Sequence, residues 1–438
     1  MLPSFPVIII PVLLLFFKAI FSHDIICNFP SIAKLMQITN ASTCSTFVQQ
    51  YLIPFDPSTI YWNTPAMKSL QMVMHNKLEN ELPLRIGILG GSVSTLWIDR
   101  SSIALQSTLN KLFNYAKVEV YNGAIGGTGA IVPAGCLSAI FGDLALDIVI
   151  LEFAINEFNV DNLMRLVEQL HYRFNNNIQI IILSITSRYM KIKSSYILEK
   201  GLMANNLVTK RYSLIRFDWS ILADKGYNIT YQPNEIWADN DQQHPVVIGR
   251  DWIQYSVGAT LKDIYDRYSY EPSIKTKPLT TLPAKRNDDF CLTAFFCNVK
   301  NQRVDNFEQY SHVAKCWRKA TKGGANACAK MVYEDDFDPT CSNGTDHTIA
   351  FVANIYKSCK LYATVVGNGE YRQPALCELD VYVNEVLAHH ASLANKYLTQ
   401  RTVLLLPIAL HRGEHNVTII GRQLQVNQTC NIASIFCV

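Results

Sequence analysis

From residue 84 to residue 270, the chain alternates short, continuous apolar runs with segments of helical periodicity. A continuous apolar run of this length is typical of a strand that is buried on both faces, as in a parallel sheet. In the first intervening segment, the apolar residues from Leu105 to Phe113 fall at i, i+4, i+7 and i+8, which predicts one buried helix face. The apolar runs predict five strands, at 84–89, 117–125, 147–155, 178–186 and 213–220.

A last helix of this region is predicted by an apolar stripe that consists of Ile253, Val257, Leu261 and Ile264. Strands that alternate with helices in this way form a parallel sheet covered by helices on both faces. Residues 84–270 are therefore predicted to form a doubly wound α/β domain. The preceding residues, 23–83, show mixed helical patterning without a strong motif.

The composition and the hydrophobic pattern of the sequence change after residue 270. Residues 271–290 are rich in proline, threonine and lysine, as expected of a linker. Residues 291–438 hold nine cysteines and short β-like runs separated by turn residues, which predicts a disulfide-rich β-sandwich domain. The runs that predict its strands are 347–356, 360–366, 378–383, 402–410 and 416–420.

The first residues have the character of an export signal. An apolar core extends from Val7 to Phe17 and is followed by Lys18. This core is short for a membrane span, which needs about 20 apolar residues. Residues 1–22 are therefore interpreted as a cleaved signal peptide, and a retained membrane anchor is the alternative. Only in the second case would the protein be stably inserted in a membrane.

Cysteines and glycosylation sequons support the secreted interpretation. The chain has 12 cysteines and no C-x-x-C pair, a pattern that favours disulfides over zinc. Three cysteines precede the linker and nine follow it, so complete pairing requires at least one bridge between the two halves. Five N-glycosylation sequons are present, at Asn40, Asn228, Asn343, Asn416 and Asn427.

Charge and histidine patterns exclude some function classes. The formal net charge is +3 and no block of lysine and arginine stands out, which argues against a nucleic-acid partner. His411 and His415 are four residues apart, but Gly413 between them favours a turn over a metal site. The adjacent His389 and His390 are interpreted as surface residues rather than ligands.

The end of the first predicted strand reads Gly90-Gly91-Ser92. A phosphate-binding P-loop requires a lysine that is absent here, and the glycine spacing does not fit a dinucleotide site. The nucleophile elbow of α/β-hydrolases requires a glycine where this chain has Ser94. The carboxyl end of a parallel strand is nevertheless where open α/β sheets place their sites. Ser92 is thus either a nucleophile or a turn and capping residue.

Further polar motifs lie at strand ends or before a helix. Asn122 to Gly129 follow the second strand, Asn156 follows the third, and Asp241-x-x-His244-Pro245 precedes the last helix. With Gly90-Gly91-Ser92, these four blocks resemble the SGNH/GDSL hydrolase family in order and spacing, over about 165 residues. The resemblance implies a flavodoxin-like SGNH hydrolase domain and a serine esterase.

The resemblance assigns a role to each block. Ser92 matches the nucleophile, His244 the general base, and Asp241 the acid that orients the base. The oxyanion hole is matched by Asn156 and by Gly127, with Gly126 as the alternative. These roles agree with the chemistry, because a serine hydroxyl needs an imidazole to accept its proton and the developing oxyanion needs fixed donors.

Two positions depart from the family pattern. The third block commonly reads Gly-x-Asn-Asp, whereas this chain has Ala154-Ile155-Asn156-Glu157, and Ser94 stands where the family often has threonine. Glu157 is expected to alter the local hydrogen bonding, and neither change removes a reactive group.

The sequence therefore predicts a secreted, glycosylated serine esterase that needs neither metal nor organic cofactor. Its predicted substrates are short-chain acyl esters, including O-acetyl groups on glycans, and it would act through an acyl-enzyme. Two alternatives remain open at this point. One is a non-catalytic glycan-binding glycoprotein that keeps the SGNH fold, and the other is a Golgi O-acyltransferase with the same chemistry.

Overall fold

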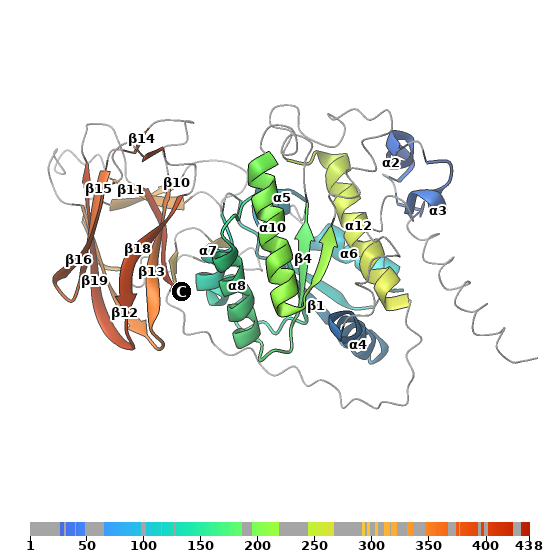
Figure 1. Ribbon diagram of the computed structural model, residues 1–438, viewed down its shortest axis with the longest axis horizontal. Coiled ribbons are helices and arrows are strands. Elements are labelled where there is room, and N and C mark those ends of the chain that lie inside the picture. Colours follow the sequence, from blue (N-terminus) through green and yellow to red (C-terminus); the bar gives the residue numbers. More distant parts are fainter. Residues whose placement is uncertain are drawn as a thin grey trace, which may run out of the picture. The chain divides into compact units, whose positions relative to one another are not determined.

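The structure of the protein is a computed structural model of the 438-residue chain (Figure 1). The residues that it describes are 27–29, 32–39, 41–48, 65–97, 102–114, 116–126, 128–185, 195–218, 244–266, 291–293, 296–297, 303–304, 311–315, 317–321, 331–335, 347–366, 374–375, 377–392, 396–397, 402–423 and 431–438. The predicted signal peptide and the predicted linker lie outside these residues. Among the described helices, none has the length and apolar character of a membrane span.

The chain forms two compact units that do not follow the order of the sequence. The first unit comprises residues 1–124, 145–160 and 177–282. The second comprises residues 125–144, 161–176 and 283–438.

The first unit contains a five-stranded parallel sheet with the strand order β2-β1-β3-β4-β5. This order is that of flavodoxin-like doubly wound sheets. All five predicted strands of this region are confirmed: β1 extends one residue beyond its apolar run, and the other four are somewhat shorter than theirs. The strands are β1 (Leu84–Gly90), β2 (Val118–Asn122), β3 (Ile148–Glu152), β4 (Gln179–Ser184) and β5 (Ile215–Asp218).

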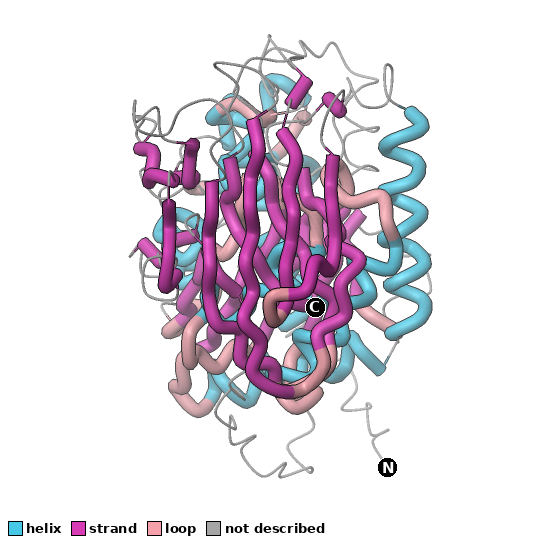
Figure 2. The backbone as a smooth tube through the Cα atoms, turned by 90° about the vertical axis from the view of Figure 1, so that its left-hand side faces the viewer, coloured by secondary structure: helices cyan, strands magenta, loops and turns pink. Residues whose placement is uncertain are grey.

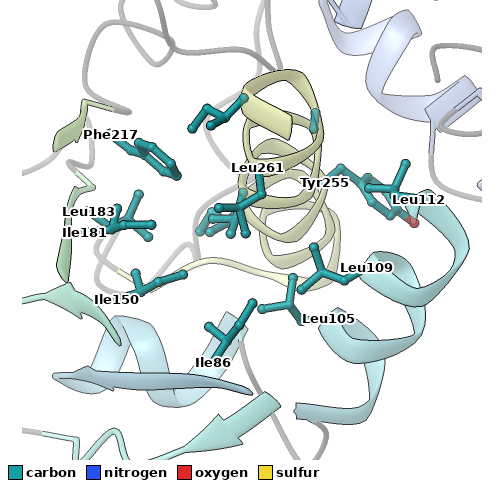
Figure 3. Packing of buried hydrophobic residues seen from close by; sticks show 14 of the residues in the cluster. Ile86, Leu105, Leu109, Leu112, Ile150, Ile181, Leu183, Phe217, Tyr255 and Leu261 are labelled. Atoms are coloured by element: carbon teal, nitrogen blue, oxygen red, sulfur yellow. The ribbon is translucent and has the colours of Figure 1, made fainter. Parts of the chain in front are cut away.

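The apolar core of this unit forms between the sheet and two helices whose apolar faces were predicted. Helix α6 (Ser102–Leu112) contributes Leu105, Leu109 and Leu112, each fully buried. Helix α12 (Val247–Asp266) contributes Tyr255 and Leu261. Figure 3 shows that buried side chains of the two helices lie in one cluster with strand residues such as Ile86 and Ile150. Every residue of β3 is buried, because a central strand of a doubly wound sheet has no solvent-facing side.

The N-terminal segment adds helices to the same core. These are α2 (Ile32–Thr39), α3 (Cys44–Phe47) and α4 (Pro65–Glu79), and a disulfide joins Cys27 to Cys44. The ring of Phe29 stacks on Tyr255 of α12 with centroids 4.8 Å apart. The unit also contains α5 (Ser92–Trp97) and α10 (Ser195–Tyr212).

Polar side chains of α4 hold the carboxyl end of α12. Gln71 Nε2 donates to the carbonyl of Ile264 at 2.6 Å, and His75 Nε2 lies 3.0 Å from the carbonyl of Tyr265. The last carbonyls of a helix have no partner within the helix, so these contacts satisfy groups that would otherwise be buried unpaired. They fix the helix that follows His244.

The second unit is built around a β-sandwich, and the antiparallel strands of its sheets lie side by side in Figure 2. One sheet has the order β10-β11-β20-β13-β18, with β6 paired to β20, and the other has the order β16-β15-β19-β12-β9. Apolar residues from both sheets form one core, which includes Phe351, Leu361, Val381 and Ile419. The predicted β-sandwich is thereby confirmed as part of the fold, while its predicted bounds, 291–438, stay a prediction.

The elements of the second unit have the following bounds. Its helices are α7 (Ile131–Phe141) and α8 (Val160–Arg173). Its strands are β6 (Cys291–Thr293), β7 (Phe296–Cys297), β8 (Arg303–Val304), β9 (Ser311–Lys315), β10 (Trp317–Thr321), β11 (Met331–Asp335), β12 (His347–Ile355), β13 (Cys359–Val366), β14 (Pro374–Ala375), β15 (Cys377–Val383), β16 (Val386–Ser392), β17 (Lys396–Tyr397), β18 (Thr402–Leu410), β19 (Gly413–Gln423) and β20 (Asn431–Cys437).

A disulfide between Cys136 of α7 and Cys291 of β6 crosses the predicted linker. Complete pairing of the cysteines, which was favoured over a pair of free thiols, required at least one such bridge, and this prediction is confirmed. Helix α7 also lies against β20, because a Cβ on Gly135 would come within 2.4 Å of the Phe436 ring. A further disulfide, Cys359–Cys437, joins β13 to β20.

Cleavage of the chain within residues 271–290 is expected to leave the two fragments covalently joined. A protease site inserted there would be cut, and the products run as one band on a denaturing gel until a reductant opens Cys136–Cys291. The variant Cys136→Ser should give two bands without reductant. Separation of the wild-type fragments without reductant would contradict the bridge.

Candidate active site

Ser92 lies at the carboxyl edge of the parallel sheet, where β1 passes through Gly91 into α5. Strand β1 is central in the sheet, with β2 on one side and β3 on the other. The strand order reverses direction between β1 and β3, and open α/β sheets place their ligand sites at such a switch point. The turn therefore presents the Ser92 hydroxyl at the edge where a site is expected.

The structure brings His244 to Ser92 from 152 residues away in the sequence. The His244 Nε2 atom lies 2.9 Å from Ser92 Oγ, which is hydrogen-bond distance. His244 is separated from the first residue of α12 by Pro245 and Val246. The position of its imidazole therefore depends on helix α12, whose carboxyl end is bound by side chains of α4. Both side chains are partly exposed, which leaves the pair accessible to a substrate.

Asn156 lies beside the nucleophile, in a tight turn after β3. The backbone N–H groups of Asn156 and Glu157 both donate to the carbonyl of Phe153, at 3.0 and 2.9 Å. The turn directs the Asn156 amide against Gly91, because a Cβ on Gly91 would lie 2.1 Å from Asn156 Oδ1. A side-chain amide at this place can supply a donor to an acyl oxygen bound near Ser92.

The packing explains why two glycines precede the serine. A side chain at Gly91 would overlap the Asn156 amide, as described above. A Cβ on Gly90 would lie 2.2 Å from Ser94 Oγ and 2.7 Å from the carbonyl oxygen of Glu152. Each glycine thus leaves room for a polar group that must pass close to the backbone.

A third close approach supports the Asn156 turn from helix α10. A Cβ on Gly201 would lie 1.9 Å from the carbonyl oxygen of Ala154. Only a glycine allows the helix backbone to come this near to the turn, so α10 limits where Asn156 can move.

A buried acid and serine, which sequence reasoning did not assign to the site, lie behind the nucleophile. Ser94 Oγ donates to Glu152 Oε2 at 2.9 Å, and both residues have no exposed surface. Burial raises the pKa of Glu152 from 4.5 to about 7, against the opposing effect of hydrogen bonds from Ser94. The sequence signal that could have identified Glu152 is its position as an acidic residue at the end of an otherwise apolar, buried strand.

The remaining predicted site residues are only partly described. Asp241 and Gly127 lie outside the described residues, as do the sequons at Asn40, Asn228, Asn343 and Asn427. Gly126 lies in a turn closed by hydrogen bonds from the N–H and hydroxyl of Thr128 to Ile125. Asn416 is exposed on β19. Its sequon was predicted as a glycosylation site, and this stays a prediction.

Histidines of the two pairs noted in the sequence contact nearby residues, and Glu157, which departs from the family pattern, does so too. His411 precedes β19, and its carbonyl oxygen lies 2.8 Å from His415 Nε2. His390 Nδ1 lies 2.6 Å from Asp380 across two paired strands. Within the described part of the chain, no group of three potential ligands could hold a metal ion.

The Glu157 carboxylate accepts the N–H of Asn159 at 2.9 Å, just before α8.

No model of a known protein family matches the sequence, and no curated protein matches it. Among solved structures, a two-domain esterase active on acetylated mannans matches with a TM-score of 0.56 and 15% identity, over 86% of this chain and 98% of that chain. A structure of a two-domain esterase active on acetylated mannans, co-crystallised with mannopentaose, matches with a TM-score of 0.54 and 13% identity, over 86% of this chain and 97% of that chain.

At these identities the matches establish a likeness of fold. The chain has the α/β domain with an additional β domain that is found in two-domain esterases.

Proposed function

We propose that the protein is a serine esterase of the SGNH type, with Ser92 as its nucleophile and His244 as its general base. The observation that carries the proposal is the 2.9 Å contact between His244 Nε2 and Ser92 Oγ at the carboxyl edge of the parallel sheet. The Asn156 amide beside Gly91 supports it, since an acyl-transfer site needs a donor next to the nucleophile.

The proposed reaction proceeds through an acyl-enzyme. Ser92 Oγ attacks the carbonyl carbon of the ester while His244 Nε2 accepts the hydroxyl proton. The tetrahedral intermediate collapses as its bond to the alcohol oxygen breaks, and His244 returns the proton to the departing alcohol. Water, deprotonated by His244, then attacks the acyl group on Ser92, the bond from the acyl carbon to Ser92 Oγ breaks as His244 returns the proton to that oxygen, and the carboxylic acid is released.

Three further residues complete the proposed site. Asn156 stabilises the oxyanion through its side-chain amide, and the backbone N–H of Gly127 joins it. Asp241 accepts a hydrogen bond from the second nitrogen of His244, which fixes the tautomer and stabilises the imidazolium.

The proposed substrates are short acyl esters, with O-acetyl groups on glycans as the foremost class. The fold likeness to an esterase active on acetylated mannans supports this choice, although one fold can serve many substrates. We further propose that the protein is secreted and glycosylated. The disulfides Cys27–Cys44, Cys136–Cys291 and Cys359–Cys437 support an oxidising compartment.

Release of acetate from acetylated mannan and acetylated xylan tests the proposal. Protein purified from a secretory host should release acetate from at least one of these glycans, and Ser92→Ala should release none above background. The same reactions with an unacetylated glycan as acceptor distinguish hydrolysis from transfer, because a transferase would acetylate the acceptor. Equal release by wild type and Ser92→Ala would contradict the proposal.

Among simple esters, acetate is expected to be the best acyl group. Burial of a long chain requires an extended apolar channel, since each buried methylene contributes about 0.8 kcal/mol. The described part of the segment between β4 and β5 contains helix α10, and no apolar insertion is evident in the sequence of that segment. Nitrophenyl acetate, butyrate, octanoate and palmitate should therefore show falling kcat/KM in that order. A higher value for octanoate or palmitate would redirect the substrate class to lipids.

A further inference from the structure

The turn that carries Ser92 is held from behind by Glu152, at the end of β3. In the sheet register Glu152 is paired with Gly90, and its carbonyl oxygen accepts the N–H of Gly91 at 3.2 Å. Its side chain accepts the hydroxyl of Ser94 at 2.9 Å and also a hydrogen bond from the Ser94 backbone. Glu152 therefore binds the residue before the nucleophile and the residue two positions after it.

The environment of the Glu152 carboxyl disfavours a charge. The side chain is fully buried, and among the residues that the structure describes its second oxygen, Oε1, has no hydrogen-bond partner. An ionised carboxylate with one unsatisfied oxygen is costly in such a place, whereas the protonated acid is neutral. A negative charge here would also lie behind the position where the oxyanion forms.

We propose that Glu152 is a positioning residue for Ser92 and that it acts in its protonated form. This inference rests on the proposed function of Ser92. The carboxyl group fixes the Gly90–Ser94 turn through Ser94, and the backbone carbonyl of the same residue fixes it through Gly91, so that the Ser92 hydroxyl stays within reach of His244. Loss of its proton places a charge behind the site and opposes the transition state.

Several titratable groups on the described neighbouring elements are paired elsewhere, and His244 faces Ser92. On β1, Arg85 bonds Glu119 at 2.9 Å, and at the amino end of β3, Asp147 bonds Lys77 at 2.9 Å. After β3, Glu157 bonds the N–H of Asn159, and before α12, His244 faces Ser92. On α12, Arg250 donates to the carbonyl of Pro245. Helix α5 carries no charged residue.

The test compares Glu152→Leu and Glu152→Gln in steady-state acetyl-ester hydrolysis across pH. Glu152→Leu removes the acceptor, so kcat should fall about 10- to 100-fold, as for a nucleophile displaced by a fraction of an ångström to 1 Å, with KM unchanged. Glu152→Gln keeps a neutral acceptor and should retain kcat within roughly threefold of wild type near pH 6. The wild-type kcat should decline as pH rises through about 7, and Glu152→Gln should lack this decline.

Each result decides part of the proposal. A kcat for Glu152→Leu within twofold of wild type would overturn the positioning role. Equal impairment of Glu152→Gln and Glu152→Leu would overturn the protonated form. Glu119→Gln is the matched control, because Glu119 is an acid on β2, a strand of the same sheet. This variant should keep the wild-type pH profile. If Glu152→Leu does not fold, Ser94→Ala removes the hydroxyl donor instead, and an unchanged kcat in that variant overturns the proposal.

Thermal unfolding separates a failure of this inference from a failure of the esterase assignment. The pKa of Glu152 is raised in the folded protein from 4.5 to about 7, so the folded state holds a proton that the unfolded state has lost between these values. The wild-type Tm should therefore fall, relative to that of Glu152→Gln, as pH rises from about 4.5 to 7. Parallel Tm curves would refute the protonated form even in a protein without esterase activity.

Discussion

Replacement of Ser92 by alanine is expected to abolish both ester hydrolysis and covalent labelling by a fluorophosphonate probe. The probe reacts only with a serine whose hydroxyl is activated, and the contact of Ser92 with His244 is the means of activation. Loss of either member of such a pair lowers kcat by about 10⁴- to 10⁶-fold. His244→Ala should therefore also lose labelling, although its serine is intact.

Fluorescent-probe gels and acetate release provide the two measurements, and Ser94→Ala is a useful comparison because it retains the nucleophile. That variant should still be labelled, at a reduced rate. Mass spectrometry of the labelled wild-type peptide should place the adduct on Ser92. Labelling of Ser92→Ala to the wild-type extent would show that another residue is the nucleophile.

Gly91→Ala is expected to lower kcat by about 100- to 1,000-fold, the loss associated with removal of one oxyanion-hole donor. The added Cβ would lie 2.1 Å from Asn156 Oδ1, so the amide has to leave its place beside Ser92. Asn156→Ala removes the same amide directly and should have a similar effect. The double variant should be little worse than either single variant, because both changes remove one interaction.

Steady-state kinetics and thermal unfolding should be measured together for this series. Gly258→Ala is the matched control, since its Cβ would lie 2.9 Å from the flexible Leu112 side chain in the core, away from Asn156. It should lose stability without a comparable loss of kcat. A Gly91→Ala enzyme with wild-type kcat would remove the reason for assigning the oxyanion role to Asn156.

The sequence predicted most of the first unit because its central strands, β1, β3 and β4, are buried on both faces. Such strands must be largely apolar, as β3 is apart from Glu152, and their positions can therefore be found without knowledge of their neighbours. The apolar face of α6 was equally evident, since its leucines recur at helical spacing. By contrast, β10, β11 and β16 were not predicted. The charged residues Arg318 and Glu334 do not show the apolar pattern of a strand. They belong to strands because β10 pairs with β11, and in that register the two residues lie opposite each other.

The candidate site was predicted as a set of residues, while its geometry came from the fold. Gly90-Gly91-Ser92 and the Asp-x-x-His motif are visible in the sequence, and their resemblance to a known family suggested their roles. Only the parallel sheet and helix α12 bring His244 to Ser92 across 152 residues. The reason for Gly91 also lies outside its own segment, in the amide of Asn156.

By itself, the sequence determined the strands of the sheet and the need, for complete cysteine pairing, of a bridge across the linker, because these depend on local periodicity and on cysteine count. Tertiary structure alone decided that Cys136 pairs with Cys291, that Gly201 brings α10 against the Asn156 turn, and that Glu152 is buried behind Ser92. These facts depend on which distant segments meet. Burial, pKa and close approach are properties of the surroundings of a residue, and the surroundings are assembled only when the chain folds.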